Sequence, residues 1–401
     1  MFENIAAAPP DAILGISEAF NKDPNPNKVN LSVGVFKDEA GKTPIPNAVK
    51  EAEKRLLDRE KSKSYLPIDG AAEFCQATAE LLFGKDHEVL ANKRSCTAHT
   101  PGGTGALRVA ADFVKTHAPN ATVWCSIPTW PNHPKIFQAA GLKTKEYAYF
   151  DAAAHGVNLD GMLAAIKQMA AGDVICLHAC CHNPTGADLT AAQWKLVADA
   201  VYAQGVLPLL DFAYLGFGDG LTEDATALNE LARPGVEMLI ASSYSKNFGL
   251  YNERVGALTV VTKDSATAAK VASQVKSTIR TNYSNPPSHG GAVVREILSD
   301  AALRSQWEGE LTAMRDRING MRKLFADTMA QKLPSRDFRF IEKQRGMFSY
   351  TGLTPAQVDI LKEKFGVYIV RDGRINVAGI TPTNCGPLCD AIADAIKSTG
   401  G

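Results

Sequence analysis

Short apolar runs alternate along this chain with longer segments in which apolar residues recur every three or four positions. The runs are typical of buried strands, and they lie at 122–127, 174–178, 207–214, 238–241 and 257–261. Helical spacing follows elsewhere, for example from Leu107 to Val114. Strands that alternate with helices predict an open α/β sheet, in which ligands bind at the carboxyl ends of the strands.

The segments outside this alternation predict a second folding unit. Apolar positions from Trp307 to Phe325 predict a long amphipathic helix that leads into it. The stretches after this helix, together with a short strand expected at 29–35, predict a small α+β domain. Residues 1–10 are largely apolar and end in two prolines, which indicates an arm that packs on another surface, such as a second subunit.

Composition narrows the class of function. The chain has 401 residues, of which 45% are hydrophobic, so a large core is expected. Lys+Arg and Asp+Glu number 43 each, and this zero net charge argues against a nucleic-acid or membrane partner and favours a small molecule. Eight scattered cysteines, a start without a signal-peptide pattern and no apolar run of about 18 residues predict a cytoplasmic protein with free thiols.

One lysine, Lys246, lies between two of the apolar runs. A lysine at the end of a buried strand is costly unless it is used, and a neutral lysine amine forms a Schiff base with an aldehyde. Ser243, Ser245 and Arg254 are donors for a dianionic group nearby in the sequence. An amine and anion-binding donors together indicate pyridoxal 5'-phosphate. The alternative is a surface loop with a solvated lysine.

Three other stretches are consistent with a bound planar cofactor. Asp211 ends an apolar strand, so its carboxylate must face a cation or a strong donor. Trp130 follows another strand and either stacks on a planar ring or fills the core. The glycine-rich turn at 100–105 opens a helix, whose N-terminus offers N–H groups to a phosphate; a plain tight turn is the alternative.

Three isolated residues outside these stretches are also notable. Gly34 either lets a substrate approach the backbone or simply ends a strand. Arg374 lies between apolar strand residues, which is unusual for a solvated charge. Arg280 is expected in a polar loop at 278–287.

A metal site is the alternative for the polar residues that follow the run at 174–178. The residue types of a metal site are present at His178, Cys180, Cys181 and His182. Adjacent residues of an extended segment point to opposite faces, and no second ligand pair has the usual spacing. We therefore expect no metal.

The run from Ser242 to Gly256 resembles that of the bacterial class I aspartate and aromatic aminotransferases, which are fold type I pyridoxal-phosphate enzymes. The resemblance extends, in order along the chain, to Pro101–Gly105, Cys181–Gly186, Asp211–Tyr214 and Arg374–Gly379. It implies a large α/β domain with a central, mostly parallel sheet and a smaller α+β domain. The implied boundaries are an arm at 1–10, a small domain at 11–43 and 314–401, and a cofactor-binding domain at 44–313.

The resemblance also implies roles toward the cofactor. Lys246 would bind it covalently and then move the proton of the substrate α-carbon, and Asp211, supported by His133, would pair with the pyridine nitrogen. Tyr214, the third implied catalytic residue, would hydrogen-bond the ring 3'-oxygen. The other implied cofactor contacts are Gly103, Thr104, Trp130, Asn183, Ser243, Ser245, Arg254 and, from a neighbouring subunit, Tyr65.

The implied reaction is ping-pong transfer, through pyridoxamine phosphate, from L-aspartate to 2-oxoglutarate, which gives oxaloacetate and L-glutamate. Arg374 would bind the substrate α-carboxylate, and Arg280 of a neighbouring subunit the distal carboxylate. Gly34, Trp130 and Asn183 are the other implied substrate contacts. A site shared in this way implies a homodimer, with small amino acids and 2-oxo acids as the remaining partners.

Three other activities are alternatives. An aromatic aminotransferase is the main alternative: the segment 344–353 and Leu66-Pro67 resemble that type. The aspartate type is favoured by residues expected around the site, which are Val35, Lys37, Thr43, Thr104 and Asn285. A pyridoxal-phosphate-binding sensor would need a basic DNA-binding segment, which is absent from the sequence. A decarboxylase would leave one carboxylate unbound, which two carboxylate-binding arginines argue against.

Overall fold

The structure of this chain is a computed structural model that describes residues 2–7 and 14–400. The chain forms two compact units: Met1–Thr43 with Pro184–Gly186 and Arg317–Gly401, and Pro44–Asn183 with Ala187–Asp316. Of the expected arm, the structure describes only Phe2–Ala7, and the rest lies outside the described residues. The expected boundaries at 11–43, 44–313 and 314–401 stay a prediction about folding domains.

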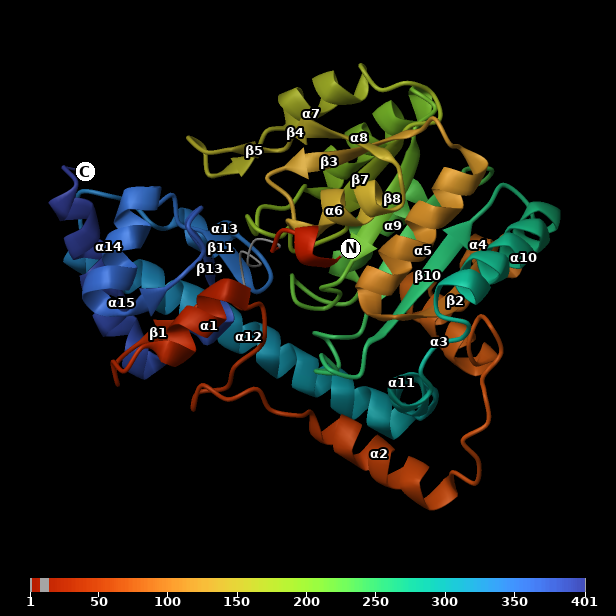
Figure 1. Cartoon of the computed structure of the whole chain (residues 1–401), viewed down its shortest axis with the longest axis horizontal. Coiled ribbons are helices and arrows are strands. Elements are labelled where there is room, and N and C mark those ends of the chain that lie inside the picture. Colours follow the sequence, from red (N-terminus) through yellow and green to blue (C-terminus); the bar gives the residue numbers. More distant parts are fainter. Residues whose placement is uncertain (1, 8–13, 401) are drawn as a thin grey trace. The chain divides into compact units, whose positions relative to one another are not determined.

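A seven-stranded sheet forms the centre of the larger unit (Figure 1). In spatial order its strands are β2 (Ser95–Pro101), β10 (Val255–Val261), β9 (Met238–Ser243), β8 (Leu207–Phe212), β7 (Val174–His178), β3 (Thr122–Ile127) and β4 (Lys143–Ala148). Strand β10 is antiparallel to both of its neighbours, and the other pairs are parallel. The expected mostly parallel sheet is therefore confirmed.

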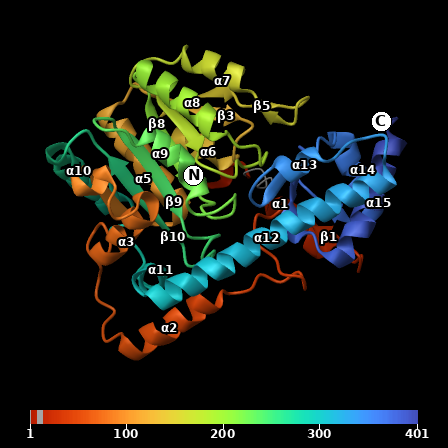
Figure 2. The same cartoon turned by 180° about the vertical axis from the view of Figure 1, so that it is seen from behind.

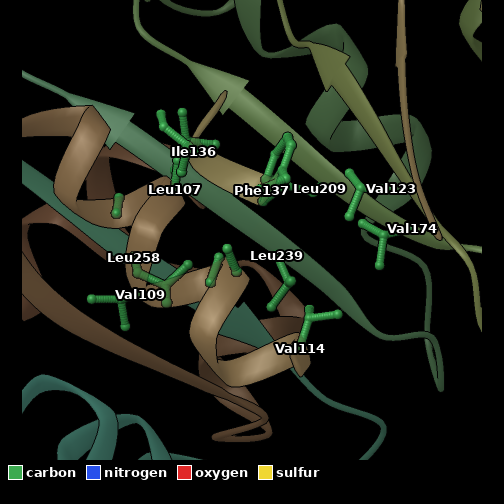
Figure 3. Close-up of a cluster of buried hydrophobic side chains, with 14 of the residues drawn as sticks. Leu107, Val109, Val114, Val123, Ile136, Phe137, Val174, Leu209, Leu239 and Leu258 are labelled. Atoms are coloured by element: carbon green, nitrogen blue, oxygen red, sulfur yellow. The ribbon is translucent and has the colours of Figure 1, made fainter. Parts of the chain in front are cut away.

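One face of this sheet is covered by the helices α5 (Gly102–His117), α6 (Asn132–Ala139) and α10 (Ser265–Asn282), which share a buried apolar cluster with the strands. Figure 3 shows Leu107 and Val114 of α5 among strand residues such as Leu239 and Leu258. These α5 positions are seven residues apart, on one face of the helix. Burying them holds the N-terminus of α5 at the edge of the sheet where several strands end.

The remaining elements complete the larger unit, and Figures 1 and 2 show helices on both faces of the sheet. The helices are α2 (Asn47–Arg59), α3 (Ala72–Phe83), α4 (Glu88–Ala91), α7 (Leu159–Ile166), α8 (Ala191–Ala203), α9 (Thr226–Leu231), α11 (His289–Ser299) and the first part of α12 (Ala301–Lys332). A short 3-10 turn (Glu223–Ala225) and the strands β5 (Phe150–Asp151) and β6 (Gly156–Val157) lie between them.

The smaller unit combines two strand pairs with helices, as expected for an α+β domain. Strand β1 (Val29–Asn30) is parallel to β12 (Val367–Tyr368), and β11 (Phe348–Tyr350) is antiparallel to β13 (Arg374–Asn376). The helices are α1 (Leu14–Lys22), α13 (Phe340–Lys343), α14 (Pro355–Phe365) and α15 (Pro382–Ser398), with the last part of α12 and a 3-10 turn (Val377–Gly379). None of the helices in the described ranges offers the long uncharged apolar run that a bilayer span requires.

Two expectations about local structure are wrong. Arg280 lies in the last turn of α10 and not in a loop, because Val275 and Ile279 are buried one helical turn apart and continue the helical period to Asn282. The strand expected at 29–35 ends at Asn30. The carbonyls of Val33 and Val35 instead accept hydrogen bonds from the Asn376 side chain, at 2.7 and 2.8 Å.

Candidate active site

Several polar residues lie at one end of the central sheet because the parallel strands finish there together. Asp211 is in register with His178 on β7 and with Ala241 on β9. Ser243 ends β9, and Lys246 follows in the turn toward β10. The sequence pattern of apolar runs that end in polar residues thus corresponds to one region of the larger unit.

Asp211 is held by a histidine from α6. His133 Nε2 lies 3.0 Å from Asp211 Oδ2, and its Nδ1 lies 2.9 Å from Thr129 Oγ1. Burial raises the pKa of Asp211, but the hydrogen bond and the electrostatic attraction from His133 outweigh it, with His178 and Lys246 contributing, so the pKa is lower than usual. A buried carboxylate that stays ionised is suited to pair with a cationic group of a ligand.

Two further histidines extend this group, and the sequence analysis weighed them only as metal ligands. The ring of His178 is 5.0 Å from that of His133 and 4.3 Å from that of His182. His182 Nε2 lies 3.0 Å from Ser126 Oγ. Within the described residues, neither ring nitrogen of buried His178 has a hydrogen-bond partner. Burial lowers the pKa of both His178 and His182 well below the usual range, so both rings are neutral.

The candidate metal ligands at and after the end of β7 lie in two separate groups. His178 lies with His133 and Asp211, whereas Cys180 and Cys181 lie with Asp224. The Asp224 carboxylate already accepts backbone N–H groups, which come from Gly216, Gly218 and Asp219.

Lys246 is half-buried above an aromatic ring. Its Nζ lies 5.0 Å from the centre of the Tyr214 ring. Burial lowers the pKa of Lys246, the charge of Arg254 lowers it further, and Asp211 opposes this shift. A lowered pKa increases the share of neutral amine, which is the nucleophilic form.

A cradle for an anion lies at the N-terminus of α5. Pro101 precedes the helix and gives no side-chain cap, so the first N–H groups are open to a ligand. Gly102 has φ +74°, and a Cβ there would lie 2.4 Å from Arg254 Nη2. A Cβ on Gly103 would lie 3.0 Å from Ser243 Cβ. The guanidinium and a serine therefore sit directly against the helix start, with half-buried Thr104 next in sequence.

Arg254 is itself positioned by short-range contacts. Its Nη1 donates to the Tyr251 carbonyl at 2.9 Å and to Ser245 Oγ at 3.4 Å. The Ser245 N–H donates to Ser243 Oγ at 3.3 Å. Together these groups form a donor set of the kind that binds a dianion.

The other predicted cofactor contacts, together with Arg280 as a predicted substrate contact, fall into two groups. Half-buried Trp130 is edge-on to His133, with ring centres 5.3 Å apart, and Asn183 is buried in the segment after β7. Tyr65 is 93% exposed, and Arg280 is exposed and donates to Ser284. Within the described residues, neither Tyr65 nor Arg280 has a hydrogen bond or ion pair to the Lys246 group.

The smaller unit holds a second candidate group around Arg374. This residue is only 2% exposed; its Nη2 donates to the Ser32 carbonyl at 2.7 Å, and its Cζ lies 4.3 Å from the centre of the Phe348 ring. A Cβ on Gly34 would lie 2.4 Å from Phe348 Cζ, so this position needs a glycine. A buried guanidinium stacked on an aromatic ring is suited to bind a carboxylate in a fixed plane.

The donor set of the larger unit fits one kind of molecule. An open helix start with Arg254 suits a phosphate, Asp211 suits a protonated ring nitrogen, and Lys246 suits an aldehyde. Gly102 and Thr129 are contributors that the sequence analysis did not single out. The sequence offered one indication of the role of Gly102, namely its position at the start of a predicted helix.

Comparison with known proteins gives consistent matches over nearly the whole chain. A family model described as "Aminotransferase class I and II" matches residues 26–392. The chain is 55% identical over 392 residues to an aspartate aminotransferase of Salmonella typhi, with 98% of this chain and 99% of that protein covered. It is 45% identical over 394 residues to an aromatic-amino-acid aminotransferase of Escherichia coli, with the same two coverages.

A solved structure matches equally well. An aromatic-amino-acid aminotransferase of Burkholderia pseudomallei, covalently bound to pyridoxal phosphate, superposes with a TM-score of 0.97 at 48% identity. The match covers 98% of this chain and 99% of that one.

Proposed function

Because the chain belongs to the aminotransferase class I and II family, we propose that it is a pyridoxal 5'-phosphate-dependent transaminase that moves the amino group of L-aspartate to 2-oxoglutarate. The observation that carries the proposal is the pairing of ionised, His133-bound Asp211 with Lys246, whose pKa is lowered, at one end of the central sheet. The same site thus keeps the Asp211 carboxylate ionised and leaves part of the Lys246 amine neutral, and the reaction needs both.

The cofactor would be held by the groups described above. The start of α5, Ser243, Ser245 and Arg254 would bind its phosphate, and Asp211 its ring nitrogen. Trp130, Asn183 and Tyr214 would contact the ring. When bound, pyridoxal phosphate supplies an aldehyde that exchanges amino groups and a ring that withdraws electrons from the substrate α-carbon.

The residues of the chain would then orient the substrate and move its proton. Arg374 would take the α-carboxylate in a planar, two-point contact, beside Gly34, whose lack of a side chain lets it pack on the Phe348 ring. Lys246 Nζ would accept the α-proton and return it, since its lowered pKa leaves amine free to act as a base. Asp211 would remain ionised throughout because the hydrogen bond from His133 lowers its pKa.

Aspartate is the proposed donor because a 55% identical relative is an aspartate aminotransferase. An aromatic-amino-acid aminotransferase is the second candidate, supported by the relatives of that name at 45% and 48% identity. Lys37, one of the residues that favour the aspartate type, is half-buried in the smaller unit, and burial lowers its pKa.

A homodimer with shared sites is part of the proposal. Tyr65 and Arg280 are both exposed, as expected of residues that serve the site of a neighbouring subunit. A cytoplasmic location is also part of it, since none of the eight cysteines, all of them within the described residues, forms a disulfide, and such thiols suit a reducing compartment.

The proposal is tested by finding where the cofactor attaches. The protein is incubated with pyridoxal phosphate and then with borohydride, which makes a bond to a lysine permanent, and its peptides are examined by mass spectrometry. We expect the added mass on the peptide that contains Lys246 and none in Lys246→Ala. Labelling of other lysines only, or of none, would reject this site.

A further inference from the structure

In the smaller unit, the segment that follows β1 makes a tight turn at Gly34. The last backbone hydrogen bond to β12 comes from the Leu31 N–H, which donates to the Tyr368 carbonyl at 2.8 Å. The N–H of Val35 then donates to the Val33 carbonyl at 3.0 Å, which makes a three-residue turn with Gly34 at its centre. One internal hydrogen bond does not offset the entropy cost of ordering three residues, so the turn depends on contacts from outside.

The side chain of Asn376 supplies these contacts. It lies on β13, two residues after Arg374, and its Nδ2 donates to the carbonyl of Val33 at 2.7 Å and to that of Val35 at 2.8 Å. Its Oδ1 accepts from the Ala378 N–H at 3.1 Å. Only the NH₂ group of an amide can donate to two carbonyls, so these contacts determine the orientation of the amide. Asn376 is completely buried, and water therefore does not compete for them.

The turn and the Arg374 guanidinium share one aromatic ring. A Cβ on Gly34 would lie 2.4 Å from Phe348 Cζ, at the tip of the ring, and Arg374 Cζ lies 4.3 Å from the ring centre. Arg374 Nη2 also donates to the Ser32 carbonyl at 2.7 Å, directly before the turn. Gly34 is therefore placed next to the group proposed to bind the substrate α-carboxylate.

The ring itself is held independently of the turn. Buried Arg322 donates from Nη2 to the carbonyls of Gly346 and Phe348, at 2.7 and 2.8 Å. The Phe348 backbone also pairs with that of Asn376 between β11 and β13. The ring and the guanidinium on it thus have several supports, whereas the turn depends on the amide of Asn376.

The turn presents a donor to a ligand. Within the described residues, the N–H of Gly34 has no hydrogen-bond partner, and Gly34 is only half-buried. A backbone N–H next to a guanidinium can donate to the same carboxylate. A small movement of the turn would take this N–H away from the carboxylate and leave the guanidinium in place.

We propose that Asn376 is a positioning residue for the substrate α-carboxylate. By binding the carbonyls of Val33 and Val35, it keeps the Gly34 N–H beside the Arg374 guanidinium, and it does not contact the substrate itself. The inference rests on the proposed function, which assigns the α-carboxylate to Arg374. Loss of the amide should weaken the binding of every ligand with that carboxylate and have little effect on the proton transfer at Lys246.

The test measures binding and turnover separately in the cofactor-loaded protein. Succinate, a dicarboxylate without an amino group to transfer, is titrated in a calorimeter. Asn376→Asp keeps the shape of the side chain but removes the donor, and Asn376→Ala removes the donor without adding a charge. In both variants we expect the dissociation constant of succinate to rise by about tenfold, the equivalent of one or two lost hydrogen bonds. KM for L-aspartate and for 2-oxoglutarate should rise similarly, while kcat falls by less than about threefold.

Gln357→Glu is the matched control for loss of a buried amide in the same unit. Gln357 Nε2 donates to Thr399 Oγ1 at 3.0 Å, so this variant also loses a donor. It should lower the melting temperature but leave the succinate dissociation constant and both KM values unchanged.

Three results would overturn the positioning role: no saturable binding of succinate by the unaltered protein, unchanged binding in folded Asn376→Ala, or an equal loss in Gln357→Glu. A different result would count against the proposed function alone. It is the absence of transamination by the unaltered protein while Asn376→Ala still weakens succinate binding.

Discussion

His133 donates a hydrogen bond to Asp211 across 3.0 Å, and both residues are buried. This contact decides the charge of the carboxylate, because burial alone would raise its pKa. The second nitrogen of His133 is bound by Thr129, which fixes the ring toward Asp211. The electrostatics of the proposed cofactor site therefore depend on a residue that touches no expected ligand.

Replacing His133 by Ala should reduce kcat/KM by roughly 10- to 100-fold, the equivalent of one lost hydrogen bond to a charged group. Since the pKa of Asp211 would rise, the loss should be larger at low pH, and the acidic limb of the pH profile should move upward. The measurement is kcat/KM as a function of pH. His117→Asn, at an exposed position, is the control, and matching profiles for the two variants would contradict the role.

Lys246→Ala should lower transamination by more than roughly 1,000-fold, because the proton of the substrate loses its acceptor. The circular-dichroism spectrum and melting temperature should stay close to those of the unaltered protein. Lys115→Ala, on the outer part of α5, should keep its activity. Turnover at the normal rate by Lys246→Ala would show that another residue moves the proton.

Gly102→Ala should weaken pyridoxal-phosphate binding and destabilise the fold by about 1–3 kcal/mol. The position has φ +74°, and the added methyl would collide with the Arg254 guanidinium. Gly309→Ala is the matched control: nothing lies within 4 Å of a Cβ there, so it should stabilise α12 by about 0.5–1 kcal/mol. Cofactor titration and urea unfolding measure both effects, and normal cofactor affinity in Gly102→Ala would contradict the cradle.

Arg280→Leu should depress kcat/KM for aspartate far more than for phenylalanine. A lost contact to the distal carboxylate is worth about 2–5 kcal/mol, and phenylalanine has no such carboxylate. Arg371→Leu serves as the control for removal of an exposed arginine. Equal losses for the two substrates would mean that Arg280 does not bind the distal carboxylate.

His99 should make the protein sensitive to acid. Burial lowers its pKa to about 4, from an ordinary value of 6.5, so the unfolded chain binds a proton that the folded chain excludes. Stability should be full above pH 6.5 and fall as the pH drops toward 4, by about 3 kcal/mol in total. Urea unfolding as a function of pH should show this loss, reduced in His99→Gln. An undiminished loss in His99→Gln would place the acid sensitivity elsewhere.

The larger unit was the more predictable part of the fold. The strands at 122–127 and 174–178 match β3 and β7 residue for residue, because a strand buried on both faces is a continuous apolar run. The sequence predicted a loop at Arg280 because polar residues surround it there. Ile279, which is buried and extends α10, is a single apolar residue and too weak a pattern to predict a helix. The strand predicted at 29–35 is too long because the backbone after Asn30 is bound by the side-chain amide of Asn376, far along the chain, and not by a neighbouring strand.

The candidate site likewise contains residues that the sequence predicts and residues that it does not. The sequence predicts Lys246, Asp211 and the glycine-rich turn, since each is a polar or flexible residue at the end of an apolar strand. It does not predict the unpaired imidazole of His178, or that of His99, because both depend on which groups the fold brings near. Pairing between distant residues is what a single sequence does not contain.

The most direct test of the proposed reaction is kcat/KM for L-aspartate compared with L-phenylalanine, with 2-oxoglutarate as acceptor and the cofactor-loaded protein as enzyme. We expect transfer from both or from aspartate alone, with a large preference for aspartate. Comparable values would contradict the aspartate assignment and support the aromatic type. No transfer from either donor would contradict the transaminase itself.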